Sequence, residues 1–155
     1  MIDSSGKIEW LTKDHEFQAS RSTEFFSYNG QLFVAGNTTG EINTFQRSIK
    51  PILSDKGYKA SSISMIPYGS NAYLLLSGGQ LLKYQDRKLT VEMTVPSRAT
   101  SMIRSRSGTI YLGTRSGLME LSGNNIIPAF KYNPLFSQAI ICIEEDSSGR
   151  LYFGT

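Results

Sequence analysis

Four polar side chains that could bind a ligand recur along this 155-residue chain at roughly corresponding places. They are Arg21, Lys59, Arg98 and Gln138, in the segments "SRST", "YKASS", "PSRAT" and "FSQA". Guanidinium, ammonium and amide groups donate hydrogen bonds, and the charged groups bind carboxylates especially well. Such donors could hydrogen-bond sugar hydroxyls or uronate carboxylates. For each residue alone, the alternative is the ordinary polarity of an exposed loop.

The acidic run Glu144, Glu145 and Asp146 is the second group that could do chemistry. Glycoside hydrolysis needs two carboxyl groups that flank one bond. These three residues are adjacent in a predicted strand and turn, where successive side chains point to opposite faces, so they do not converge. We expect Asp146 to cap its own turn instead. The sequence predicts no catalytic residue and favours a non-catalytic protein over a lyase or hydrolase.

The single cysteine and the single histidine exclude several kinds of site. One cysteine cannot form an internal disulfide, and one histidine with one cysteine cannot supply the usual zinc ligand sets. Cys142 lies in the apolar segment "AIICIEED", so we expect a small buried core residue and not a nucleophile paired with His15. No metal and no cofactor is predicted.

Charge and apolar patterning argue against two classes of partner. The net charge is +3, but the basic residues are scattered and form no stripe with interleaved aromatics, so no nucleic-acid partner is expected. No apolar run comes near the ~20 residues of a membrane span, so this segment is expected to make no membrane contact.

An internal repeat sets the spacing of these residues. Four segments share a pattern of turn, apolar residue, aromatic, apolar residue and small residue, and their aromatics are spaced by 40, 38 and 41 residues. The aromatics are Phe33, Tyr73, Tyr111 and Tyr152. In the first three segments a second turn follows, with Gly40, Gly79 or Gly117, as a tight hairpin requires.

Each unit contains about four short strands. Segments rich in Ile, Ser, Thr and Phe precede each aromatic strand, and outer strands are predicted at 47–53, 89–95 and 124–130. Pro51 and Pro128 suit an edge strand, where a missing N–H donor costs least. No window shows the apolar period of an amphipathic helix. Four strands in roughly 40 residues are typical of a β-propeller blade, so the predicted fold class is all-β, with about four blades' worth of chain.

The repeated aromatics have a structural role in this fold. A blade cannot bury both of its faces alone, so neighbouring blades must pack on it. We expect the aromatics to fill the space between blades, and the small residues Ala35, Gly113 and Gly154 to let adjacent sheets approach.

The predicted domain is a single, partial propeller over 1–155. Gly6 fits the register of Gly40 and not that of Gly149, so the chain is expected to open with the back half of one blade and close with the front half of another. The predicted units are 1–20 (back half), 21–58, 59–97, 98–135 and 136–155 (front half). The halves could close a four-bladed ring, but part of a larger, for example seven-bladed, propeller is favoured.

The repeats resemble the two-component regulator propeller repeat. The segment "AIICIEEDSSGRLYFGT" matches almost throughout, and "TSMIRSRSGTIYLGTRSGLMEL" departs at Ser105, where the family prefers Asp. The repeats around Phe33 and Tyr73 match more weakly, and the family's usual Trp is Phe or Tyr throughout. The resemblance covers most of the chain and is carried by structural residues.

This resemblance implies a sensor. Such repeats typically form the periplasmic part of hybrid histidine kinases, where the ligand is commonly an oligosaccharide. It implies a periplasmic, ligand-sensing region of a two-component sensor whose signal peptide lies outside this segment. Propeller ligands usually sit on the loops that enter the innermost strands, where the four polar residues are predicted. The alternative is a protein-interaction or dimerisation scaffold whose partner is further blades or a second copy.

Overall fold

The computed structural model describes residues 22–36, 40–43, 48–52, 62–76, 78–131 and 133–155, and its regular elements are nearly all strands. The strands are β1 (Ser22–Tyr28), β2 (Gln31–Gly36), β3 (Gly40–Asn43), β4 (Ser48–Pro51), β5 (Ser62–Tyr68), β6 (Asn71–Leu76), β7 (Gln80–Gln85), β8 (Lys88–Thr94), β9 (Ala99–Arg104), β10 (Ile110–Thr114), β11 (Gly117–Ser122), β12 (Asn125–Pro128), β13 (Cys142–Glu145) and β14 (Leu151–Gly154). Two short 3-10 helices, η3 (Ala129–Lys131) and η4 (Pro134–Ser137), follow β12.

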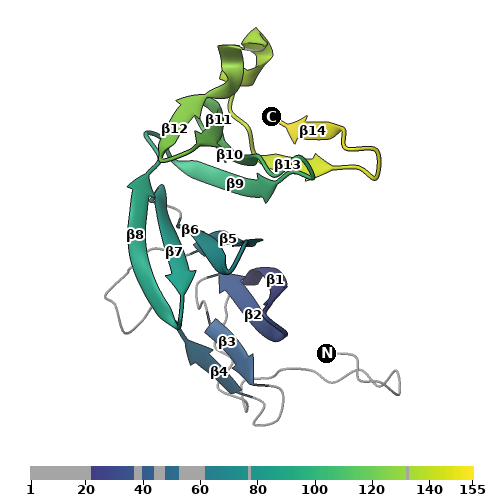
Figure 1. The fold of residues 1–155 in the computed structure, drawn as a ribbon. Coiled ribbons are helices and arrows are strands. Elements are labelled where there is room, and N and C mark those ends of the chain that lie inside the picture. The colour runs from purple at the N-terminus through teal and green to yellow at the C-terminus, as the bar shows by residue number, and fades with distance from the viewer. Residues whose placement is uncertain (1–21, 37–39, 44–47, 53–61, 77, 132) are drawn as a thin grey trace.

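The strands form antiparallel meanders in chain order. Three sheets have four strands, β1-β2-β3-β4, β5-β6-β7-β8 and β9-β10-β11-β12, and β13 pairs with β14. Figure 1 shows the sheets side by side in chain order, and the first strands of neighbouring sheets (β1, β5, β9 and β13) pack against one another. This is the architecture of β-propeller blades, which confirms the predicted fold class.

The fourth strand of each complete sheet is an edge strand, as predicted. β4, β8 and β12 each pair on one side within their sheet. Pro51 and Pro128 are the last residues of β4 and β12, where a missing N–H donor removes little pairing. The 3-10 helices were not predicted. Asn133 caps the start of η4, because its side-chain oxygen accepts a hydrogen bond of 3.0 Å from the Leu135 N–H.

In the part of the chain that the structure describes, three buried clusters lie between consecutive blades and hold the array together. The first joins Tyr28 and Phe33 to the β5–β8 sheet, and the second joins the β5–β8 sheet to the β9–β12 sheet. The third packs Leu118 and Ala129 against Ile140 and Ile143. Each blade therefore buries apolar side chains against its neighbour, as the blade hypothesis requires.

The repeated aromatics fill these interfaces. Phe33, Tyr73 and Tyr111 each lie in the cluster shared with the following blade. Burial raises the pKa of the Tyr73 phenol. Tyr152 occupies the same place in β14 but is 54% exposed, because the described residues place no blade beyond it. The packing role is confirmed for the first three aromatics.

The small residues give close approach, as predicted for Gly113. A Cβ on Gly113 would clash with Ser101 Oγ in the same sheet and lie 3.1 Å from the Ile140 carbonyl oxygen of the next blade. A Cβ on Gly154 would lie 2.5 Å from Cys142 Sγ, within its own sheet. The side chain of Ala35 is outside the described residues.

The expectation that Cys142 is buried is wrong, because this side chain is exposed. Cys142 pairs with Gly154, and Glu144 pairs with Tyr152, so these residues share one face of the β13–β14 sheet. The opposite face carries Ile143 and packs on the preceding blade. Since side chains alternate along a strand, the position of Cys142 assigns it to the open face.

Candidate ligand-binding site

The blades present two sets of loops at opposite ends of their strands. Chain segments that enter a first strand, and turns between second and third strands, share one end in an antiparallel meander. In the last two blades this strand-entry end comprises residues 95–98, 115–116 and 133–141. The turn end comprises the turns between first and second strands, namely 29–30, 69–70, 105–109 and 146–150.

Arg98 is exposed at the strand-entry end, directly before β9. Its carbonyl oxygen accepts a hydrogen bond of 3.0 Å from the N–H of Arg115, an exposed residue in the β10–β11 turn. Beside them, the hydroxyl oxygens of Ser97 and Ser116 lie 2.9 Å apart. The backbones of two exposed arginines are therefore hydrogen-bonded to each other, and two hydroxyl groups lie next to them. Such a group of donors can bind a carboxylate or several sugar hydroxyls.

Gln138 is exposed on the segment that leads from η4 into β13. This segment is tied to the preceding blade, because the Ile140 N–H donates a hydrogen bond of 2.9 Å to the Thr114 carbonyl oxygen. The Thr100 hydroxyl donates in turn to the Ile140 carbonyl oxygen. Gln138 and the two arginines therefore belong to the same end of neighbouring blades.

Gly117 allows the η4 segment to approach this turn. Its φ is +118°, a conformation that L side chains rarely adopt, and an added Cβ would clash with the Phe136 carbonyl oxygen. The same Cβ would lie 3.1 Å from Ser137 Cα. Only glycine fits here, so this residue positions the backbone that carries Gln138.

The predicted binding residues divide into two groups. Arg98 and Gln138 are exposed at the strand-entry end, whereas Arg21 and Lys59 lie outside the described residues. The binding role of all four remains a prediction. Arg115 was not predicted, because the turn before Gly117 shows only the glycine pattern of a hairpin. The meander topology alone could have indicated it, since this turn must lie beside the entry to the first strand.

Two residues of the acidic run, Glu145 and Asp146, accept hydrogen bonds at the turn end. Both carboxylate oxygens of Glu145 accept hydrogen bonds from the Arg106 N–H, at 3.1 and 2.9 Å. The Arg106 guanidinium donates to the Ser147 carbonyl oxygen at 2.5 Å. Glu145 therefore fastens the last blade to the turn of the preceding one. Glu144 is exposed on the other face of β13.

Asp146 caps its own turn, as predicted. Its Oδ1 accepts hydrogen bonds from the Ser148 hydroxyl at 2.7 Å, the Ser148 N–H at 2.8 Å and the Arg150 N–H at 3.0 Å. Its Oδ2 accepts from the Tyr152 hydroxyl at 3.0 Å. These bonds lower the pKa of Asp146 to about 2, and the bond from the Ser148 hydroxyl has the largest effect. In the preceding blade Ser105 donates to the Thr109 carbonyl oxygen at 3.0 Å and closes that turn without a charge.

This difference predicts a pH dependence confined to the last turn. The pKa of Asp146 lies below its ordinary value of 3.8, so folding favours the carboxylate. The stabilisation should be complete above that ordinary value and be lost as the pH falls through about 2. Carboxyl carbon NMR should give a titration midpoint near the lower value in the folded chain. Tyr152→Phe should raise that midpoint, and an ordinary midpoint in the unaltered chain would contradict the hydrogen-bonded turn.

Cavities occur at the turn end. One of about 250 Å³ lies between the first two blades and is lined by Tyr28, Asn29, Gln31, Phe33, Ser70, Tyr84, Asp86 and Arg87. Another, of about 370 Å³, lies between the second and third blades. Neither cavity is lined by Arg98 or Gln138.

Among the described residues, no group of three or more His, Cys, Asp and Glu side chains could hold a metal ion. The helices described are too short to cross a membrane.

The fold and its repeats define an array of β-propeller blades. Residues 134–155 match the family model described as "Two component regulator propeller". The match covers the repeat whose sequence pattern is most complete, so the resemblance is confirmed there. No curated protein matches the chain.

Solved structures share this fold. The extracellular domain of the one component system BT4673 from B. thetaiotaomicron has a TM-score of 0.77 at 14% identity, over 98% of this chain and 23% of that one. The extracellular domain of the hybrid two component system BT3049 from the same organism has a TM-score of 0.65 at 14% identity, over 86% and 19%. Virginiamycin B lyase from Staphylococcus aureus has a TM-score of 0.65 at 14% identity, over 98% and 54%. The chain therefore spans less than a quarter of each of the first two chains and about half of the third. At 14% identity the likeness is one of fold.

Proposed function

We propose that this chain is a propeller segment of the extracytoplasmic, ligand-sensing part of a two-component sensor, and that it binds an oligosaccharide without chemical turnover. The observation that carries the proposal is the backbone hydrogen bond between Arg98 and Arg115, which brings two exposed arginines together at the same end as Gln138. The family match at residues 134–155 supports the sensor role, as do the extracellular domains of similar fold. In a sensor of this class the location would be periplasmic.

A non-catalytic role agrees with how the acidic run is used. Glu145 is bonded to the Arg106 backbone and Asp146 to its own turn, so neither is free to act as a general acid or a nucleophile. The low pKa of Asp146 also makes it a poor proton donor at neutral pH. A lyase shares the fold at 14% identity, and one fold hosts many activities.

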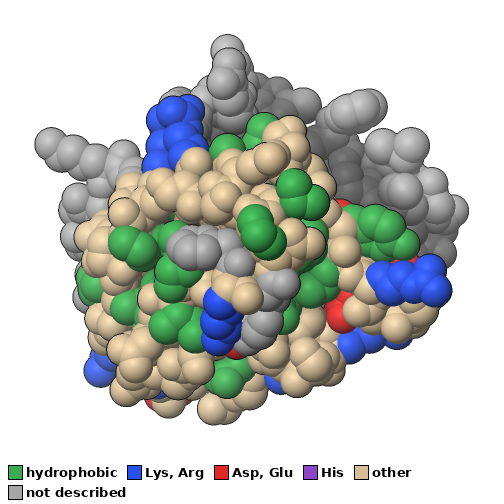
Figure 2. Space-filling model, turned by 90° about the horizontal axis from the view of Figure 1, so that it is seen from above, with side chains coloured by type: hydrophobic (Ala, Val, Ile, Leu, Met, Phe, Trp, Pro, Cys, Tyr) green, Lys and Arg blue, Asp and Glu red, His purple; other side chains and the backbone are tan. Residues whose placement is uncertain are grey.

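The open face of the last blade supports a larger propeller as the parent assembly. Tyr152 is 54% exposed where its counterparts Phe33 and Tyr73 are buried by a following blade. Figure 2, which looks down on the molecule of Figure 1 from above, shows hydrophobic side chains at the surface. A further blade packed on β13 and β14 would cover Tyr152 in the way that the β9–β12 sheet covers Tyr73.

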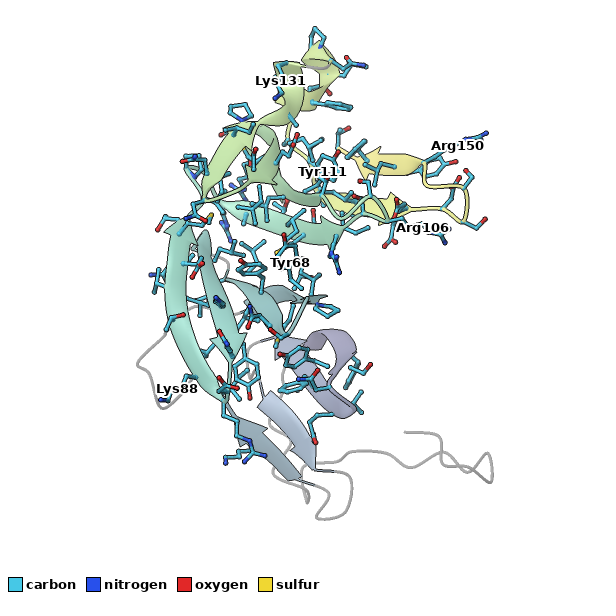
Figure 3. The ribbon with its side chains drawn as sticks, viewed as in Figure 1. Tyr68, Lys88, Arg106, Tyr111, Lys131 and Arg150 are labelled. Carbon is cyan, nitrogen blue, oxygen red and sulfur yellow. The ribbon has the colours of Figure 1, made fainter. Side chains whose placement is uncertain are left out.

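Isothermal titration calorimetry of residues 1–155 with neutral and acidic oligosaccharides tests the proposal. Arg98→Ala should weaken binding about tenfold or more, since a hydrogen bond to a charged group contributes roughly 1.5–3 kcal/mol. Lys88→Ala is the matched control, because Lys88 begins the edge strand β8 away from the strand-entry end (Figure 3). Unchanged affinity in Arg98→Ala would show that the ligand does not bind at Arg98. Cleavage of an oligosaccharide by the chain would overturn the non-catalytic role.

A further inference from the structure

A groove at the turn end lies between the first strands of the second and third blades. Its cavity of about 370 Å³ is lined by Ile66, Pro67, Ile103, Arg104, Ser105 and Arg106. The apolar part comes from the ends of β5 and β9, and the charged part from the end of β9 and the turn that follows it. We call this cavity the β5–β9 groove. It is at the opposite end of the blades from Arg98 and Gln138.

Arg104 is held over an aromatic ring beside the groove. Its guanidinium carbon lies 5.1 Å from the centroid of the Tyr68 ring, and Tyr68 is itself 39% exposed. The Tyr73 ring, 5.3 Å from the Tyr68 ring, supports it from the blade core. Figure 3 shows Tyr68 in the space between β5 and β9. A guanidinium group over a ring keeps its N–H donors available in its own plane, where a carboxylate can accept two of them.

The Arg104 charge has no carboxylate partner among the described residues. The interactions that the structure gives its side chain are with the Tyr68 ring, while the nearby Glu145 carboxylate is bonded to the Arg106 backbone. Arg106 adds a second positive charge at the groove, and its bond to the Ser147 carbonyl oxygen fixes its position. The groove therefore combines an apolar wall with two guanidinium groups.

A purely structural explanation accounts for Arg104 less well. Arg104 and Glu145 are the last residues of β9 and β13, and each reaches back to the preceding blade. Glu145 is half-buried and both of its oxygens are bonded, as a fastening between blades requires. Arg104 is exposed and borders a cavity, so most of its donors are left for another partner.

We propose that the β5–β9 groove binds a hexuronate residue of an acidic oligosaccharide. The saccharide nature of the ligand rests on the proposed function, whereas the carboxylate follows from the groove itself. Arg104 binds the carboxylate through paired N–H donors, and the second guanidinium of Arg106 raises the local positive potential. The C–H face of the pyranose ring lies on Ile66, Pro67 and Ile103. A neutral sugar would leave the Arg104 guanidinium without an anionic partner, so the groove selects acidic chains.

The test is calorimetric titration of residues 1–155 with tetragalacturonate and, in parallel, with cellotetraose. Arg104→Gln should weaken tetragalacturonate binding at least tenfold, and Arg104→Lys should weaken it less because the charge remains. Arg150→Gln is the matched control, since it removes the same charge from the turn end but Arg150, on the β13–β14 turn (Figure 3), does not line the groove. Circular dichroism of each variant verifies that the fold is retained.

The outcomes separate this inference from the proposed function. Full tetragalacturonate affinity in Arg104→Gln, or binding of cellotetraose alone, would overturn the hexuronate site and leave oligosaccharide binding in place. Loss of binding in Arg104→Gln but not in Arg98→Ala would support the groove and overturn the strand-entry site. If neither oligosaccharide binds the unaltered chain, both proposals are wrong.

Discussion

Gly117→Ala is expected to destabilise the chain by roughly 3 kcal/mol. The backbone at φ +118° is strained for any residue with a Cβ, and that Cβ would clash with the carbonyl oxygen of Phe136. Backbone strain costs about 1–3 kcal/mol and forced repacking about as much again. A urea titration followed by circular dichroism measures the free energy of unfolding.

The chain offers a matched control for this prediction. Gly123, in the β11–β12 turn, also has a positive φ, +59°, but a Cβ added there would have no atom within 4 Å. Gly123→Ala should therefore cost only the backbone term, about 1 kcal/mol. Equal losses in the free energy of unfolding for the two variants would show that the close approach of Phe136 to Gly117 does not affect stability. Phe136 lies two residues before Gln138, so a displaced Phe136 backbone would also shift Gln138. Gly117→Ala should therefore also weaken ligand binding at the strand-entry end.

Leu112→Ala is expected to cost about 3–5 kcal/mol, the largest effect of a single side chain. Leu112 is fully buried in the cluster shared by the second and third blades. Truncation removes its apolar contacts and leaves a cavity that neighbouring sheets, already in contact, cannot easily fill. Urea unfolding of the purified variant measures the loss.

Val91→Ala provides the comparison for Leu112→Ala. Val91 is 50% exposed on the edge strand β8, so its truncation should change the free energy of unfolding by less than about 0.5 kcal/mol. Similar losses in both variants would mean that the interface between blades contributes no more to stability than the outer surface. That result would contradict the packing of neighbouring blades.

The turn chemistry was predictable because it is local. Asp146 caps its turn through atoms no more than six residues away. Gly79 and Gly117 have positive φ, at +84° and +118°, as their hairpins require. Side-chain oxygens and glycine act on backbone groups that the sequence itself places nearby, so a repeated pattern identifies them.

The core between blades was predictable for the same reason. The spacing of Phe33, Tyr73 and Tyr111 identified the strands and their period, and alternation along each strand identified a buried face. Alternation could not indicate that the face of Cys142 would be open. That outcome depends on a neighbouring sheet, and the described residues place none there.

By itself, then, the sequence determined the repeating four-stranded units and their turns, since these depend on propensity, periodicity and short-range hydrogen bonds. Only the tertiary structure decided which residues distant in the sequence meet. It joins Arg98 to Arg115, Arg104 to Tyr68 and Glu145 to the Arg106 backbone. The last two contacts cross blade boundaries, between residues 36 and 39 positions apart. Such contacts depend on how closely and at what angle neighbouring sheets pack, which no local pattern specifies.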